Sequence, residues 1–151
     1  MIIEVAKPED RQGILAVTAN IDIFTDEEKD TVRELWDDSE HGYNFLVARH
    51  EGRVIGYTCF GERALTQGSY DLFWIAVDPS ARRLGAGKAL MRATESEVQK
   101  RGGRLIIVET SGMDKYESTR AFYLGIGYQQ EAVIRDFYKP GDDLVIYTLH
   151  L

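Results

Sequence analysis

The chain has 151 residues, of which 44% are hydrophobic and 28% are charged, and its formal net charge at pH 7 is -7. This size and apolar content predict one compact domain, residues 1–151, with a buried core. The acidic balance leaves no broad basic surface of the kind that nucleic-acid binding requires, so we expect no nucleic-acid partner.

The N-terminal forty residues predict a strand and two helices. Ile2–Ala6 alternates as a short strand does and lacks the features of a secretory signal. Pro8 suits the first turn of a helix, and Thr25 suits the cap of a second helix with an acidic first turn. Acids outnumber bases between Asp22 and Glu40. This segment is either a solvated helix face or an acidic rim that attracts a cationic substrate.

Two β-rich runs follow, Tyr43–His50 and Arg53–Phe60, and the short link between them predicts a hairpin. Cys59 is the only cysteine, so an internal disulfide is excluded and we expect a small core residue. A second predicted turn, Gly61–Ser69, connects these runs to the next strand. No apolar run reaches membrane-spanning length, so we expect a cytoplasmic protein that makes no membrane contact.

The segment Tyr70–Glu95 organises the rest of the chain. Asp71–Val77 is an apolar, aromatic and β-branched run closed by Asp78-Pro79, which predicts a buried central strand and a turn. Apolar residues then recur at helical spacing until Gly102-Gly103, which predicts a helix that ends there. The apolar positions of this helix are Ala86, Ala89, Leu90, Ala93 and Val98, among Lys88, Arg92, Glu95 and Glu97.

The junction of this strand and helix, residues 82–87, reads Arg-Arg-Leu-Gly-Ala-Gly. Two glycines let the backbone approach a bound group, and the first turn of a helix offers free N–H donors and partial positive charge. With two arginines beside it, the junction suits a diphosphate, although an ordinary strand, turn and helix is the alternative. It is not a Walker A loop, which needs Gly at Arg82, nor a dinucleotide fingerprint, which needs Gly or Ala at Leu90.

The last third of the chain predicts strand, helix, strand, turn and strand. The whole order is strand, two helices, three strands, helix, strand, helix and two strands, which predicts an α/β domain with a mixed sheet of about seven strands and about four helices. The strands flanking the central helix should be parallel. His41, His50 and His150 have no ligand spacing, so we expect no metal. The last predicted elements are Arg104–Glu109, Asp114–Leu124, Tyr128–Phe137, Pro140–Asp143 and Leu144–Leu149.

Two motifs resemble the GCN5-related N-acetyltransferase (GNAT) family. Arg82-x-x-Gly85-x-Gly87, after a strand ending Val-Asp-Pro, resembles the coenzyme A pyrophosphate loop of that family, and Thr119–Tyr128 resembles its helix ending in Phe-Tyr. The element order also matches, and the resemblance is weakest before Tyr43. It implies the GNAT-like acyl-CoA N-acyltransferase fold. It also implies an acetyl-CoA-dependent N-acetyltransferase, with direct attack of a primary amine on the thioester in a ternary complex.

The resemblance implies that the cofactor is held mainly by backbone groups. Amides at the start of the central helix would bind the diphosphate, and the pantetheine arm would pair with the preceding strand. Two positions differ from the family pattern. The family often has an Asn that helps to hold the cofactor where this chain has Tyr116, and it has a small, alanine-like residue where this chain has Thr119. The expected cofactor-binding residues are Ile75, Ala76, Val77, Arg82, Arg83, Leu84, Gly85, Ala86, Gly87, Lys88 and Ser118.

The resemblance makes Tyr123 the acid that protonates the departing thiolate. A phenol with a pKa of about 10 is well matched to a thiol with a pKa near 8.5. Exposing the free base of an alkylamine at pH 7 costs about 4.6 kcal/mol, so a base or a water chain is expected. Asp71, where some family members carry a base glutamate, and Glu109 are the candidates. Each is equally compatible with a solvated or salt-bridged acid.

Two rival functions stay open. One is a non-catalytic acyl-CoA-binding or regulatory module of the same fold, which the Tyr116 departure favours. The other is an enzyme that transfers longer acyl groups. A bulky residue such as Trp74 near the thioester argues against it. Asp136, Tyr138 and the loop 139–143 fall where the family builds one wall of the acceptor site. The acceptor amine, a cationic small molecule or a peptide N-terminus, is not identified, and a homodimer through the last strands is compatible with the family.

Overall fold

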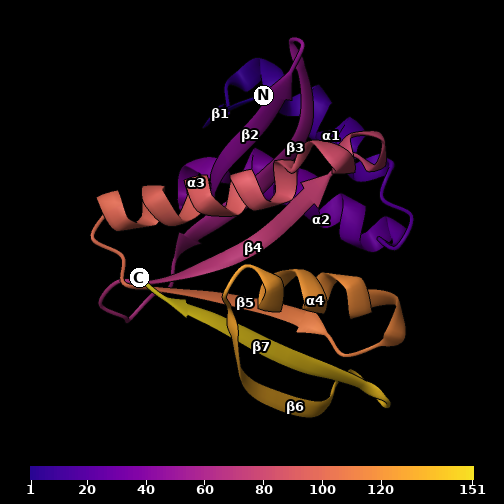
Figure 1. Cartoon of the computed structure of the whole chain (residues 1–151), viewed down its shortest axis with the longest axis vertical. Coiled ribbons are helices and arrows are strands. Elements are labelled where there is room, and N and C mark those ends of the chain that lie inside the picture. The colour runs from indigo at the N-terminus through magenta and orange to yellow at the C-terminus, as the bar shows by residue number, and fades with distance from the viewer.

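A computed structural model describes residues 1–151 as one seven-stranded sheet with helices on both faces (Figure 1). The strand order is β1-β2-β3-β4-β5-β7-β6. The predicted element order and the predicted mixed sheet with four helices are confirmed. The strands are β1 (Ile2–Val5), β2 (Asn44–His50), β3 (Arg53–Glu62), β4 (Ser69–Val77), β5 (Leu105–Ser111), β6 (Gln129–Lys139) and β7 (Asp142–His150). The α-helices are α1 (Arg11–Ala19), α2 (Asp26–Asp37), α3 (Ala86–Lys100) and α4 (Glu117–Gly125), and the 3-10 helices are η1 (Pro8–Asp10), η2 (Ser39–His41), η3 (Pro79–Leu84) and η4 (Asp114–Tyr116).

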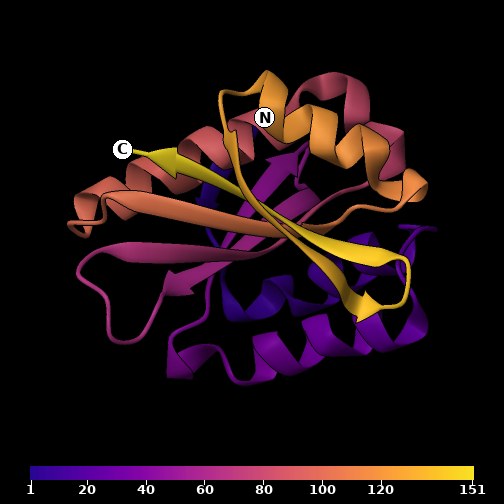
Figure 2. The same cartoon turned by 90° about the horizontal axis from the view of Figure 1, so that it is seen from below.

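Helices α3 and α4 cover one face of the sheet, and α1 and α2 cover the other (Figure 2). One core cluster lies under α3 and includes Leu90 and Val98, which are fully buried as their spacing predicts. The other lies under α1 and α2 and includes Cys59, which is fully buried. The β6–β7 hairpin curls towards the side that carries α2 (Figure 2). Residues of α2, of β4 and β5 and of this hairpin line one cavity.

Local sequence explains where the helices begin. The Thr25 hydroxyl accepts a hydrogen bond from the Glu28 N–H at 3.1 Å, and Glu28 Oε1 accepts one from the Thr25 N–H at 3.2 Å, so a capping box starts α2.

One residue of α3 does not lie where the helical pattern of the sequence places it. The pattern puts Glu95 among the charged, outward positions, but its side chain is buried. Glu95 lies inward because Arg92 and the Tyr128 hydroxyl both donate hydrogen bonds to it.

The central strands separate where the site forms. Strands β4 and β5 are parallel, as predicted, but their pairing ends at Leu72 and Val108. Strand β4 also has a bulge, because Cys59 pairs with Trp74 while Phe60 pairs with Leu72. The bulge at Phe73 turns Leu72 and Trp74 towards opposite faces of the sheet, into different core clusters. Beyond Leu72, the edge of β4 that faces β5 has no partner strand.

Several strand boundaries differ from the predicted ones. Strand β3 continues to Glu62, because Gly61 and Glu62 pair with Asp71 and Tyr70 across the hairpin, so the predicted turn Gly61–Ser69 starts too early. Strand β6 runs to Lys139, beyond the predicted end at Phe137, and it leaves the β7 ladder after Ile134 and rejoins it at Lys139. None of the helices combines the length and the hydrophobicity that a membrane-spanning helix requires.

Candidate active site

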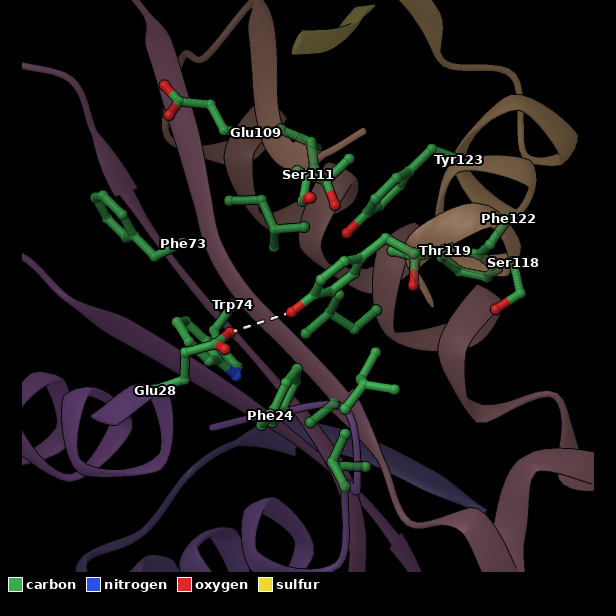
Figure 3. Close-up of a pocket in the computed structure, with 18 of the residues that line it drawn as sticks. Phe24, Glu28, Phe73, Trp74, Glu109, Ser111, Ser118, Thr119, Phe122 and Tyr123 are labelled. Carbon is green, nitrogen blue, oxygen red and sulfur yellow. Dashed lines mark hydrogen bonds between the residues drawn. The ribbon is translucent and has the colours of Figure 1, made fainter. Parts of the chain in front are cut away.

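A cavity of about 1140 Å³ opens where β4 and β5 separate. Its walls come from α2, from the start of α3, from η4 and α4, and from the β6–β7 hairpin. Figure 3 shows Trp74, Phe24 and Glu28 on one wall and Tyr123, Thr119 and Ser118 on the opposite wall. The cavity therefore joins elements that are far apart in the chain.

One end of the cavity lies at the N-terminus of α3. Gly85 has a φ of 71°, a left-handed conformation that glycine adopts without strain. The first bond of the helix runs from the Ala89 N–H to the Gly85 carbonyl at 3.1 Å, so the N–H groups of Ala86, Gly87 and Lys88 have no acceptor within the helix. These donors and the helix dipole suit a diphosphate, as the sequence predicts.

The predicted cofactor-binding residues do not all face the cavity. Arg83 and Leu84 are exposed on η3 and do not line it, and Ala86 is fully buried in the core, so only its backbone could contribute. Ser118 lines the cavity from the first turn of α4. The others that line it are Ile75, Ala76, Val77, Arg82, Gly85, Gly87 and Lys88.

The backbone of Ile75–Val77 runs along the cavity on the edge of β4 that β5 has left. On the opposite edge, Ile75, Ala76 and Val77 pair with β3. The free edge offers backbone N–H and C=O groups to an extended ligand, in the way that a sheet edge accepts an added strand. This geometry fits a pantetheine arm.

Tyr123 is 3% exposed, and Figure 3 shows its hydroxyl pointing into the cavity. Its ring packs against Phe122, Tyr128 and Tyr147, with centroid distances of 5.5, 6.0 and 5.8 Å. Burial alone raises the pKa of its hydroxyl above the ordinary value, so the phenol is protonated at physiological pH. The structure thus holds a neutral O–H donor at the wall of the cavity.

Both predicted base candidates line the cavity, and one arginine joins them. Arg63 donates to Asp71 Oδ1 at 2.6 Å and to Asp71 Oδ2 at 2.9 Å, and it donates to Glu109 Oε1 at 3.3 Å. The hydrogen bonds to Asp71 raise the pKa of the Arg63 guanidinium. Asp71 is 8% exposed, whereas Glu109 is on the surface of the cavity.

The β6–β7 hairpin forms a further wall. Tyr138, Lys139 and Asp142 line the cavity. Burial raises the pKa of Tyr138, and the charge of Glu109 adds to the effect. Asp136 does not line the cavity: it has a φ of 56°, and its carboxylate accepts from the Gly141 N–H at 2.8 Å. Asp136 therefore shapes the turn.

Sequence reasoning missed one cavity residue, Arg63, and it named Trp74 without foreseeing its surroundings. Arg63 lies in a predicted turn, and only the pairing of Gly61 with Asp71 across the β3–β4 hairpin brings it to the acids. Trp74 Nε1 is the one buried side-chain nitrogen or oxygen without a hydrogen-bond partner, and the indole packs edge-on against Phe24 at 5.3 Å. No three His, Cys, Asp or Glu side chains come together in a way that could hold a metal ion.

Comparisons with known proteins agree with this geometry. The model of the acetyltransferase (GNAT) family matches residues 14–128. A 5-NmdU N-acetyltransferase of Pseudomonas phage PaMx11 is 30% identical over 131 residues, which are 85% of this chain and 86% of that protein. The [ribosomal protein bS18]-alanine N-acetyltransferase of Escherichia coli K12 is 33% identical over 92 residues, which are 57% of this chain and 61% of that protein.

A solved structure shows the same architecture over the whole length. The crystal structure of a protein from Desulfovibrio desulfuricans, described as an acetyltransferase of the GNAT family, superposes with a TM-score of 0.94. The two sequences are 39% identical, and the match covers 99% of this chain and 98% of the other.

Proposed function

Because this chain belongs to the GNAT family and is an N-acetyltransferase, we propose that it moves the acetyl group of acetyl-CoA to a primary amine by direct attack within a ternary complex. Acetyl-CoA, which the family uses, supplies the thioester. One observation carries the proposal: the Tyr123 hydroxyl faces the same cavity that receives the start of α3 and the free edge of β4. A proton donor for the leaving thiolate and the backbone groups that would bind the cofactor therefore line the same cavity.

The cofactor is held by backbone groups in this proposal. The free N–H groups at the start of α3 bind the diphosphate, with Arg82 adding charge and Gly87 permitting a close approach. The edge of Ile75–Val77 pairs with the pantetheine arm, and an N–H group there donates to the thioester carbonyl oxygen. Ser118 adds a polar contact from α4.

Proton transfers are assigned to three side chains. Tyr123 gives its phenolic proton to the departing thiolate, and the neighbouring aromatic rings fix the orientation of its ring. Asp71 or Glu109 accepts a proton from the ammonium form of the acceptor, directly or through a water. Both carboxylates line the cavity, which supports a role for either.

The acceptor we propose is a cationic amine. Glu27 and Glu28 from α2 and Asp142 from β7 line the cavity, and two of these three belong to the acidic segment of the sequence. The names of two relatives state a 5-NmdU and a protein alanine as substrates, so amines on both small and large molecules occur among similar proteins.

A homodimer through β6 is a further part of the proposal. All residues of this edge strand are exposed, including Val133, Ile134 and Phe137. An antiparallel pairing of two copies centred on Val133 would set Glu131 of one copy opposite Arg135 of the other. Light scattering should report a dimer that Val133→Lys converts to a monomer, and a monomeric unaltered protein would refute this part.

The experiment that tests the enzymatic proposal is a panel of primary amines with acetyl-CoA, followed by thiol release. Calorimetric titration with acetyl-CoA runs alongside it. Binding together with turnover supports the proposal. Binding without acetylation of any amine favours the non-catalytic acyl-CoA-binding module instead, and an acyl-chain series tests the enzyme for longer acyl groups.

A further inference from the structure

Asp71 and Glu109 share one cation of the cavity lining, Arg63, but they do not bind it equally closely. Arg63 makes three close contacts with Asp71, two of them to Oδ1 and one to Oδ2, between 2.6 and 3.1 Å. Its one contact with Glu109 is 3.3 Å, beyond the ordinary range for such bonds. The Asp71 side chain is 11% exposed and that of Glu109 is 40% exposed. The guanidinium therefore belongs to Asp71.

We propose that Arg63 is a positioning residue: Asp71 anchors its guanidinium, and the guanidinium steadies Glu109 as the carboxylate that takes the proton of the acceptor amine. This inference rests on the proposed function. It gives the two carboxylates different roles, one structural and one chemical.

Charge supports this division. The three groups sum to -1, and the close pairing of Arg63 with Asp71 leaves that charge on Glu109. An ammonium group entering the cavity meets one uncompensated carboxylate there. Asp71, with both oxygens engaged and little exposure, would have to break a charge-assisted ion pair before it could accept a proton.

The proton balance also favours Glu109. The ammonium gives one proton to Glu109, and the nitrogen lone pair then attacks the thioester carbon. As the C–S bond breaks, Tyr123 protonates the thiolate, and the second proton of the attacking nitrogen restores the phenol. Glu109 must then release its proton to water, so one proton leaves per turnover. A half-exposed carboxylate can do this, whereas the buried Asp71 is shielded.

Two ionisable side chains interact with Glu109 besides the acceptor it would meet. Arg63 faces it from the β3–β4 turn, and Tyr138 is close enough on β6 to feel its charge. Asp71 lies behind Arg63 on the neighbouring strand. Removal of Asp71 would therefore leave Glu109 as the remaining ion-pair partner of the guanidinium.

The test is a rescue experiment with the full chain. Asp71→Asn should lower kcat by about 10²-fold, because Arg63 then engages Glu109 completely. Adding Arg63→Gln to that variant frees Glu109, and kcat should recover to within about tenfold of the unaltered protein. Glu109→Gln should lower kcat by about 10²-fold or more and remove the acidic limb of the kcat/KM pH profile, which the double variant keeps.

Controls separate folding from chemistry. Each variant is checked by thermal unfolding and by acetyl-CoA titration, since the diphosphate end of the cavity is remote from Arg63. Asp37→Asn breaks a matched arginine–aspartate pair, Arg11 with Asp37 at 3.1 Å, outside the cavity, and should leave turnover unchanged.

The outcomes are distinct. A folded double variant that binds acetyl-CoA but stays as slow as Asp71→Asn would overturn the inference, because freeing Glu109 would then not restore turnover. Turnover of Glu109→Gln within about threefold of the unaltered protein would overturn it too. If the unaltered protein acetylates no amine, the proposed function itself fails and the inference falls with it.

Discussion

The Tyr116 hydroxyl donates a hydrogen bond to Glu28 Oε2 at 3.3 Å across the cavity (Figure 3). It is the one hydrogen bond that joins α2 to η4 and α4, and it links residues 88 positions apart. Burial raises the pKa of Tyr116 to about 12, and the charge of Glu28 adds to this shift, so the phenol remains a donor. Tyr116 stands where the family often has a cofactor-binding Asn, and here its hydroxyl reaches Glu28 on α2, on the wall where we propose that the acceptor binds.

Replacement of Tyr116 by Phe should weaken acceptor binding more than cofactor binding. The bond holds Glu28, which lines the proposed acceptor wall, and because it is long it is worth only about 0.5 kcal/mol, so the acceptor KM should rise about twofold. Steady-state kinetics and acetyl-CoA titration measure the two effects, and Tyr43→Phe, outside this cavity, is the control. A larger loss of acetyl-CoA affinity than of acceptor affinity would assign Tyr116 to the cofactor.

Replacement of Tyr123 by Phe should lower kcat by about 10²-fold to 10⁴-fold, because the thiolate then leaves without a proton donor. Acetyl-CoA affinity should hardly change, since the ring stays in its aromatic cluster. Single-turnover kinetics and calorimetry measure both. Unchanged turnover would remove Tyr123 from the mechanism.

Replacement of Gly87 by Ala tests the diphosphate site without strain. The added Cβ would meet the Phe122 ring at 3.4 Å, an ordinary contact, and the φ of Gly87 is not positive. Stability should therefore be kept or improved by up to about 1 kcal/mol, because alanine favours helix. Acetyl-CoA affinity should fall at least about tenfold, because the methyl group blocks the approach of the diphosphate.

The matched control for this variant is Gly125→Ala at the end of α4. A Cβ there meets nothing within 4 Å, and the residue does not line the cavity. It should leave acetyl-CoA affinity unchanged. Equal affinity of the Gly87→Ala variant and the unaltered protein would move the diphosphate away from this turn.

Asp78→Asn should destabilise the protein in a pH-dependent way. Asp78 is buried and accepts hydrogen bonds from the Ser80 hydroxyl at 2.7 Å, the Ser80 N–H at 2.9 Å and Asn20 at 3.1 Å. The Ser80 hydroxyl is the main cause of the lowered pKa of Asp78. A lowered pKa stabilises the fold above the unfolded value of about 3.9, and this contribution disappears as the pH falls through the folded value.

Urea unfolding at pH 7 and pH 3 measures that contribution. The Asn variant should lose about 1–2 kcal/mol at pH 7 and less at pH 3. Asp30→Asn, at an exposed position on α2, is the control and should change little at either pH. A loss that is the same at both pH values would show that the charge of Asp78 has no part in it.

Much of the fold could be predicted because its signals are local. Thr25 caps α2 through groups three residues away, and the glycines at 85 and 87 mark the start of α3 by conformational freedom alone. The run Asp71–Val77 has a strand composition that depends on no distant partner. Such signals need only neighbours in the chain, so the sequence contains them in full.

The roles of the carboxylates could not be read in the same way. Asp71 and Glu109 look alike in sequence, as acids on adjoining strands. The sequence by itself determined the element order and the position of the glycine turn at the start of α3. Only the tertiary structure decided that Arg63 binds Asp71 closely and Glu109 loosely, and that Tyr116 reaches Glu28. These pairings depend on the strand register, the bulge at Phe73 and the separation of β4 from β5, which arise when distant segments pack together.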